Sequence, residues 1–308
     1  MSLLSTVSSQ PQHLRRCTFV RRLSVLDARL YDERAQCSVL QWWPTPLKNL
    51  ASTSPSSRVS MSLYPRLALV TGGAGGIGKA TCHALAAQGA SVIVADLKLD
   101  AAKLVASELP GAGTHRGVLL DVSDTNSVDR LFADIKDTES LPVSIVVNCA
   151  GIAKSSPLVD TTDENFVRTL QVNLKGTFLV TRAAARAMIA TGVTEGVIVN
   201  IASIVGRIGC SGMAAYSASK GGVVALTKTV AQEMAPHGIR CNVVLPSLTK
   251  TPMADSLPEK TQKTCIALTP LQRAAEPEEV AEAILFLCSP NSSFVTGVTL
   301  EVTGGLIM

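Results

Sequence analysis

A glycine-rich loop is the feature that most limits how this chain can fold. Thr71-Gly72-Gly73-Ala74-Gly75-Gly76-Ile77-Gly78 follows a short apolar run at 67–70 and precedes an Ala-rich stretch with helical spacing at 79–88. Glycines permit a tight turn and let the backbone approach a phosphate, while a helix N-terminus supplies free N–H groups and the positive end of its dipole. A strand, a glycine loop and a helix in this order predict a pyrophosphate site, although an ordinary tight turn also uses glycine.

Short apolar runs alternate with longer helical stretches along the rest of the chain. Strands are predicted at 67–70, 91–95, 118–120, 144–147, 196–201, 240–245 and 299–302. Helices are predicted at 79–88, 100–109, 126–135, 163–189, 214–235 and 278–287. Such alternation indicates parallel strands joined by crossover helices. We therefore expect a single α/β domain at residues 61–308, a Rossmann-type doubly wound parallel sheet with helices on both faces.

The composition is that of a folded protein with a large core. Apolar residues make up 46% of the 308 residues and charged residues 17%, which excludes the disordered class. No apolar stretch approaches the roughly 18 residues of a membrane-spanning helix, so no membrane span is predicted. Eight Cys without a Cys-x-x-Cys pair and four scattered His predict reduced thiols and no metal site.

The first 60 residues differ from the rest. They hold eight Lys or Arg, three acidic residues and eleven Ser, with no acid before Asp27. This is typical of a mitochondrial transit peptide and predicts the mitochondrial matrix as the location. Met61 lies just ahead of the first predicted strand and would be a natural start for the domain, so a non-functional extension on a cytoplasmic protein is the alternative. The remaining residues carry about as many acidic as basic groups, so no nucleic-acid surface is predicted.

Asp96 ends the second predicted strand, 18 residues after Gly78. A carboxylate here can accept hydrogen bonds from both adenosine ribose hydroxyls, and it would repel a 2′-phosphate. It therefore predicts NAD(H) as the cofactor in preference to NADP(H). The alternative is that Asp96 only caps a turn or a helix. The nearby Lys98 could also pair with a 2′-phosphate, which would allow NADP(H).

Two further strand ends carry candidate cofactor contacts. Asp121 and Val122 follow the third predicted strand, where the carboxylate would meet the adenine amino group or cap a turn. Asn148, Ala150 and Gly151 follow the fourth predicted strand, where small residues would let the ribose pack closely. Both segments would then border the nucleotide.

Tyr216 and Lys220 are four residues apart on a predicted helix and therefore share a face. Ser203 lies 13 residues before Tyr216, just after a predicted strand, and Asn173 lies in the long helix upstream. Each residue alone has a structural explanation, since tyrosines pack, lysines reach solvent and serines cap helices. In this order and spacing after the glycine loop, however, the combination is specific.

With these motifs the chain resembles the short-chain dehydrogenase/reductase family over about residues 65–308. The matching residues are Thr71-Gly72-x-x-x-Gly76-Ile77-Gly78, Asn148-x-Ala150-Gly151, Asn173, Ser203 and Tyr216-x-x-x-Lys220. The resemblance implies a hydride-transfer site in which Tyr216 carries the alcohol proton. It also implies that Lys220 holds the nicotinamide ribose, Ser203 orients the substrate oxygen, and Asn173 holds a water in a proton relay. Thr251 would bond the carboxamide, although Pro246-Ser247 stands where the family has Pro-Gly.

The acid–base task assigned to Tyr216 requires a shifted pKa. A free tyrosine has a pKa of about 10, so reaching about 7 takes roughly 4 kcal/mol. Lys220 and the positive nicotinamide ring would supply it by favouring the phenolate.

Longer identities indicate one branch of this family, whose members act on 3-oxoacyl thioesters and on 17β-hydroxysteroids. They lie at 172–181, 203–206, 237–242 and 301–308. The resemblance implies NAD(H)-dependent interconversion of a secondary alcohol and a ketone. The substrates would be 3-hydroxyacyl or 3-oxoacyl thioesters of mitochondrial fatty acid synthesis, and estradiol or estrone. It also implies a heterotetramer with carbonyl reductase 4. The alternative is a non-catalytic NAD-binding scaffold subunit, against which the intact Ser203, Tyr216 and Lys220 argue.

The helices predicted at 165–189 and 214–235 are apolar on more than one face. One face would cover the sheet and the other needs a second cover. We therefore expect an oligomer, and a tetramer from the resemblance, built through these helices. The apolar end at 304–308 would add a further buried contact.

Overall fold

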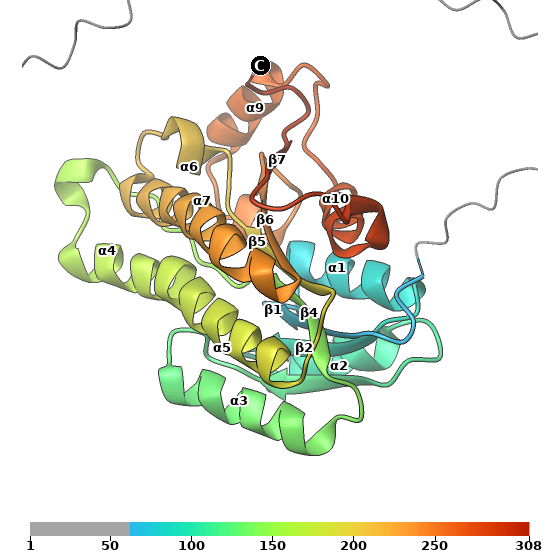
Figure 1. Cartoon of the computed structure of the whole chain (residues 1–308). Coiled ribbons are helices and arrows are strands. Elements are labelled where there is room, and N and C mark those ends of the chain that lie inside the picture. The colour runs from blue at the N-terminus through green and yellow to red at the C-terminus, as the bar shows by residue number, and fades with distance from the viewer. Residues whose placement is uncertain (1–61, 308) are drawn as a thin grey trace, which may run out of the picture. The chain divides into compact units, whose positions relative to one another are not determined.

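The computed structural model of the protein describes residues 62–307, so the predicted leader at residues 1–60 lies outside the described residues. Within them, seven parallel strands form one sheet in the order β3-β2-β1-β4-β5-β6-β7 (Figure 1). The strands are β1 (Leu67–Thr71), β2 (Ser91–Asp96), β3 (His115–Leu119), β4 (Val143–Asn148), β5 (Gly196–Ile201), β6 (Ile239–Pro246) and β7 (Thr299–Val302). This confirms the predicted doubly wound α/β fold. The strand order reverses between β1 and β4, which opens a crevice at their carboxyl ends.

Helices cover both faces of the sheet because successive strand side chains alternate between them. Ala68 and Val70 of β1 face one helical layer, and Leu67 and Leu69 face the other. The first layer consists of α1 (Gly76–Ala87), α2 (Leu99–Glu108) and α10 (Pro277–Cys288). The second consists of α3 (Thr125–Thr138), α5 (Thr177–Ala190) and α7 (Ala214–Met234), with α4 (Asp163–Leu170) packed on α7.

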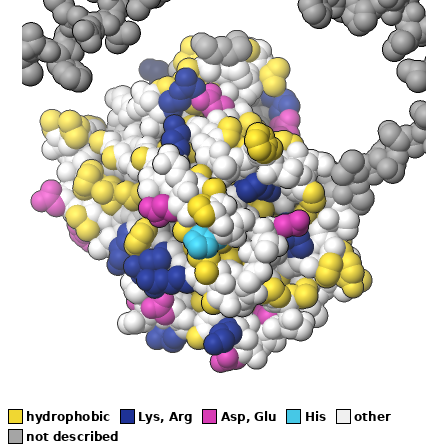
Figure 2. Space-filling model, viewed as in Figure 1, with side chains coloured by type: hydrophobic (Ala, Val, Ile, Leu, Met, Phe, Trp, Pro, Cys, Tyr) yellow, Lys and Arg dark blue, Asp and Glu magenta, His cyan; other side chains and the backbone are white. Residues whose placement is uncertain are grey.

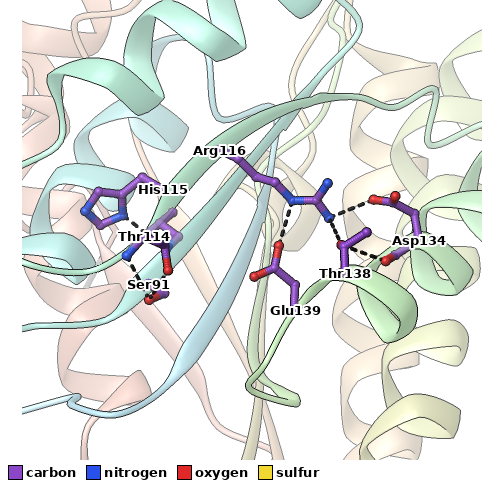
Figure 3. A network of polar contacts seen from close by, with 8 residues as sticks. Ser91, Thr114, His115, Arg116, Asp134, Thr138 and Glu139 are labelled. Carbon is purple, nitrogen blue, oxygen red and sulfur yellow. Dashed lines mark hydrogen bonds and ion pairs between the residues drawn. The ribbon is translucent and has the colours of Figure 1, made fainter.

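The third strand lies earlier than predicted, because β3 begins at His115 and not at residue 118. Its first residues are polar, yet their side chains are fully engaged. The backbone N–H of Val92 donates to His115 Nδ1 at 3.2 Å. Arg116 forms ion pairs of 2.7 Å with Asp134 on α3 and with Glu139 directly after it (Figure 3). An edge strand anchored by polar contacts lacks the apolar run on which the prediction relied.

The predicted helix at 163–189 is interrupted. A π-helical segment, η2 (Gln171–Gly176), separates α4 from α5. A π turn holds one more residue than an α turn, so it rotates the side chains that follow. It buries Val172 and Asn173 completely or nearly so. The apolar spacing of the sequence contains no sign of this turn.

Three short helices that were not predicted follow the carboxyl ends of β5 and β6. They are α6 (Val205–Ile208), α8 (Pro252–Asp255) and α9 (Glu259–Leu268). α9 buries none of its residues, so its sequence lacks the apolar stripe that predicts a helix. Among the described residues, no helix is both long enough and apolar enough to span a membrane.

Candidate active site

The glycine loop joins β1 to α1, and the helix begins inside the loop at Gly76, three residues before the predicted start. Gly72 and Gly76 have φ values of +64° and +50°, which favour glycine. A Cβ at Gly72 would lie 2.8 Å from the Ala150 backbone, and one at Gly78 would lie 2.1 Å from Gly72 O. Only glycine therefore lets β1, α1 and the end of β4 approach so closely.

The same loop fits a pyrophosphate. No side chain caps the N-terminus of α1, so its first N–H groups have no side-chain acceptor. A Cβ at Gly75 would meet nothing within 4 Å, so the outer side of the loop is open. Ile77 points inward and packs against the core between the sheet and α1. The loop thus presents backbone donors outward and is fixed from within.

Asp96 lies at the rim of this loop. Its Oδ2 accepts a hydrogen bond from Ala74 N at 3.2 Å, and its Oδ1 accepts one from Lys98 N at 3.1 Å. The carboxylate is therefore both a turn residue and a link to the glycine loop. Each oxygen retains a lone pair for a further donor, as two ribose hydroxyls would require.

Asp121 and Val122 are occupied mainly by local contacts. Asp121 Oδ1 accepts hydrogen bonds from Ser123 N at 2.8 Å and Ser123 Oγ at 2.6 Å. The hydrogen bond from the Ser123 hydroxyl is the main cause that lowers the pKa of Asp121. Val122 is buried and would touch a Cβ at Gly176 at 2.8 Å. Asp121 therefore caps the turn through Oδ1. Its other oxygen, Oδ2, has no hydrogen-bond partner among the described residues.

The side chain of Asn148 lies in the core. Its Nδ2 donates to Thr181 Oγ1 at 3.1 Å and to Asn200 Oδ1 at 2.8 Å, between β4, β5 and α5. Ala150 N donates to Thr71 Oγ1 at 3.2 Å, which ties the segment after β4 to the end of β1. Asn148 therefore holds the strands together, and the closely packed Ala150 and Gly151 border the crevice.

Ser203, Tyr216 and Lys220 come together at the carboxyl end of β5. Ser203 follows that strand, and its hydroxyl lies close enough to Tyr216 to lower the pKa of the phenol. Lys220 lies one turn beyond Tyr216 on α7, with its Nζ 5.6 Å from the centre of the tyrosine ring. Lys220 is only 4% exposed, and Nζ donates to Ile201 O at 2.7 Å. The predicted i, i+4 pair thus faces a single site.

Burial sets the proton affinity of both groups. It raises the pKa of Tyr216 to about 12, and the hydrogen bond with Ser203 acts in the opposite direction. Burial lowers the pKa of Lys220 to about 8, and the nearby Cys149 thiol opposes that shift. The phenol therefore keeps its proton at neutral pH in this structure. Additional positive charge is needed before Tyr216 can act as a base.

Asn173 lies next to this site, because its Oδ1 and Lys220 Nζ both border Gly151. Its Oδ1 accepts from Ile152 N at 2.8 Å, and its Nδ2 donates to Ile152 O at 2.9 Å and to Ser219 Oγ at 3.1 Å. The amide thus holds the segment after β4 through two hydrogen bonds to the backbone of Ile152. Its side chain is committed to Ile152 and Ser219, two contacts that the sequence pattern did not predict.

Thr251 closes the other side of the glycine loop. Its Oγ1 accepts from Ala254 N at 3.3 Å and caps α8, and its Cγ2 lies 3.0 Å from where a Cβ at Gly76 would be. Ser247, which replaces the family's glycine, fits without a positive φ. Its N donates to Val302 O at 3.1 Å and its hydroxyl to Thr303 O at 3.3 Å.

Comparison with known proteins agrees with this geometry. Residues 72–307 match the family model described as Enoyl-(Acyl carrier protein) reductase. The chain belongs to the short-chain dehydrogenase/reductase family of oxidoreductases, whose Rossmann fold binds NAD(P)(H).

Relatives with assigned names cover most of the chain. A (3R)-3-hydroxyacyl-CoA dehydrogenase from Mus musculus is 43% identical over 80% of this chain and 98% of the relative. A 3-oxoacyl-[acyl-carrier-protein] reductase from Thermotoga maritima is 40% identical over 80% of this chain and 100% of the relative. The crystal structure of a short-chain type dehydrogenase/reductase from Mycobacterium marinum is 35% identical, with a TM-score of 0.76 over 80% of this chain and 97% of that one.

Proposed function

We propose that this protein is an NAD(H)-dependent oxidoreductase that interconverts 3-hydroxyacyl and 3-oxoacyl thioesters, with 17β-hydroxysteroids as a second substrate class. The observation that carries the proposal is the cluster of Ser203, Tyr216 and Lys220 beside the glycine loop. The names of the relatives from mouse and Thermotoga maritima support an acyl thioester as substrate.

The chain's own residues would handle the oxygen and its proton. When bound, the nicotinamide would supply the hydride to the keto carbon or accept it from the hydroxyl carbon. Ser203 would donate a hydrogen bond to the substrate oxygen and orient it. Tyr216 would give its phenolic proton to that oxygen during reduction and take it back during oxidation. The Ser203 hydroxyl lies close enough to Tyr216 to lower the pKa of the phenol, so a single substrate oxygen would reach both hydroxyls.

Lys220 would tune that proton transfer. Its ammonium group lies beneath the Tyr216 ring and is held by Ile201 O at 2.7 Å. A buried cation favours the phenolate and lowers a phenol pKa. The remaining N–H groups of Lys220 would hold the nicotinamide ribose. The same residue thus connects cofactor binding to the acidity of Tyr216.

Turnover by the purified full chain tests this function. Acetoacetyl-CoA with NADH should be reduced, and estradiol with NAD⁺ should be oxidised, both followed by absorbance at the reduced nicotinamide band. A chain that binds NADH but turns over neither substrate would support the scaffold-subunit alternative. Turnover with NADPH in clear preference to NADH would contradict the cofactor proposal.

Asp96 provides a prediction on cofactor preference. Asp96→Ala should weaken NADH binding by roughly 10²- to 10⁴-fold, because two hydrogen bonds to a charged group are lost and each is worth about 1.5–3 kcal/mol. It should also narrow the preference over NADPH, since repulsion of the 2′-phosphate disappears. Asp100→Ala, in the first turn of α2, is the matched control and should leave the ratio unchanged. An unchanged ratio in Asp96→Ala would mean that Asp96 is only a turn residue.

We further propose an oligomer built through α4, α5 and α7. An almost wholly apolar groove of about 490 Å³ lies on this side of the molecule, lined by Phe166, Val167, Leu170, Leu174, Phe178 and Leu226 among others. Figure 2 views this side and shows hydrophobic side chains among basic ones at the surface. Phe166, Val167 and Phe178 are all exposed, and a second chain would remove them from water.

Charge complementarity supports a second copy as the occupant. Asp163 and Glu164 lie in the first turn of α4, whereas Arg182 and Arg186 lie on α5 near the other end of the same long helical rod. In a two-fold antiparallel pairing, the acidic end of one copy would meet the basic end of the other.

Sedimentation of the full chain at micromolar concentration tests this interface. Phe178→Asp should shift the protein to a smaller species. Leu104→Asp, which changes an exposed leucine on α2 in the opposite layer, should leave the sedimentation coefficient unchanged. A wild-type monomer would contradict the proposal. Assembly only after addition of carbonyl reductase 4 would replace the second copy by that partner.

A further inference from the structure

Ser219 lies in α7 between Tyr216 and Lys220, and its side chain is completely buried. Its hydroxyl donates to Tyr216 O at 2.7 Å and accepts from Asn173 Nδ2 at 3.1 Å. Because the only proton of the hydroxyl is used on the tyrosine carbonyl, its lone pair faces Asn173. Among the described residues, Ser219 is the only residue of α7 whose side chain is hydrogen-bonded to the π-helical segment η2.

That contact fixes the orientation of the Asn173 amide. Ser219 offers an acceptor, so Asn173 must present its NH₂ group there and its oxygen toward Ile152 N. The reversed amide would set its oxygen against Ser219 and an N–H against the N–H of Ile152. The orientation shown is therefore the only one that satisfies Ser219 and both backbone groups of Ile152.

The two hydrogen bonds from the Asn173 amide to Ile152, here called the clamp, lie close to Lys220. A Cβ at Gly151 would lie 3.3 Å from Asn173 Oδ1 and 3.5 Å from Lys220 Nζ. Residue 151 is thus squeezed between the amide and the ammonium group. Lys220 Nζ also donates a hydrogen bond to Ile201 O at 2.7 Å. A loosened segment at 151–152 would give Lys220 room to move away from Tyr216.

We propose that Ser219 is a positioning residue for the reaction, which acts through Asn173 and Ile152 to hold Lys220 beneath Tyr216. The inference rests on the proposed function insofar as Tyr216 and Lys220 are taken as the acid–base pair. Ser219 touches neither the substrate nor the reacting atoms. Its hydroxyl is not needed for the helix itself, because a serine hydroxyl that bonds a helical carbonyl does not stabilise a helix.

Ser219→Ala should leave Asn173 with an unpaired donor and a freer amide. We expect kcat to fall roughly 10- to 100-fold, as small displacements of reacting groups do, with little change in KM for NADH. The pH limb of alcohol oxidation should move to higher pH, since a displaced Lys220 favours the phenolate less. Ser219→Thr, which keeps the hydroxyl, should restore most of the activity.

Ser217→Ala is the matched control. Its hydroxyl is buried on the same turn of α7 but has no hydrogen-bond partner, so its removal should change neither kcat nor the pH limb. Equal effects of Ser217→Ala and Ser219→Ala would overturn the proposal. So would a Ser219→Ala protein that melts at a lower temperature but keeps the wild-type kcat and pH limb. If Ser219→Ala does not fold, Ser219→Cys, with a weaker donor, takes its place in the comparison.

Two further measurements separate this inference from the proposed function. In an Asn173→Ala background, Ser219→Ala should have little additional effect on kcat, whereas additive effects would show that Ser219 does not act through Asn173. Hydrogen exchange of peptides that contain Ile152 should be faster in Ser219→Ala than in wild type, because its N–H loses a fixed acceptor. That readout needs no turnover. A wild-type chain inactive on thioesters and steroids would end the proposed function, while unchanged exchange would end the clamp.

Discussion

Tyr216→Phe should reduce kcat by about 10²- to 10⁴-fold, the usual contribution of a positioned acid or base, with NADH affinity nearly unchanged. The phenylalanine ring keeps the packing of Tyr216 on α7 but removes the hydroxyl that meets Ser203. Single-turnover reduction of acetoacetyl-CoA, together with NADH titration by fluorescence, separates the chemical step from binding.

A second tyrosine provides the control for this variant. Tyr64 is 76% exposed and lies before β1, so Tyr64→Phe should leave kcat unchanged. Activity of Tyr216→Phe within a few-fold of wild type would remove Tyr216 from the reaction. Loss of NADH binding in the same variant would mean that the hydroxyl serves the cofactor and not the proton.

Lys220→Met should make the protein inactive and, at neutral pH, more stable. Holding a charged lysine in this buried site costs roughly 3 kcal/mol, the difference between its ordinary pKa of 10.5 and its value of about 8 in the folded protein. Methionine removes that cost and loses one hydrogen bond to Ile201 O, worth about 1 kcal/mol. A net gain of about 2 kcal/mol in the free energy of unfolding is expected at pH 7.

The pH dependence gives this prediction its sign. Between pH 8 and 10.5 the unfolded chain holds the Lys220 proton while the folded protein has lost it, so the wild type becomes more stable as the pH rises. The advantage of Lys220→Met should therefore shrink by about 2 kcal/mol between pH 7 and 9.5. Urea unfolding at both pH values measures it. Lys228→Met, an exposed lysine two turns further along α7, should show no such change.

The sequence was sufficient for those parts of the site that depend on spacing within one element. The glycine loop between an apolar run and a helix predicted the turn that only glycine permits at Gly72 and Gly78. The i, i+4 spacing predicted that Tyr216 and Lys220 share a face, and the structure places both beside Ser203. In each case the chain's periodicity alone determines which side chains are neighbours.

Contacts between distant elements could not be predicted in the same way. The π turn that directs Asn173 toward Ile152 packs against α7, and no residue in its sequence is typical of a π turn. The predicted start of β3 was wrong because the polar side chains of His115 and Arg116 find their partners in residues up to 23 positions away in the sequence. Ser247 is accommodated in place of a glycine, with hydrogen bonds to the carbonyl oxygens of Val302 in β7 and of Thr303 directly after it.

The attachment of Ser247 to β7 bears on when this protein becomes functional during its synthesis. Thr251 forms one wall of the nucleotide crevice against Gly76, and its segment is held by hydrogen bonds from Ser247 to Val302 and Thr303, far downstream of the glycine loop in the sequence. A ribosome-bound chain can complete the β1–β4 half early, but it lacks this wall until β7 and Thr303 emerge from the exit tunnel. We therefore expect a message truncated even shortly before β7 to yield a polypeptide that cannot retain a dinucleotide.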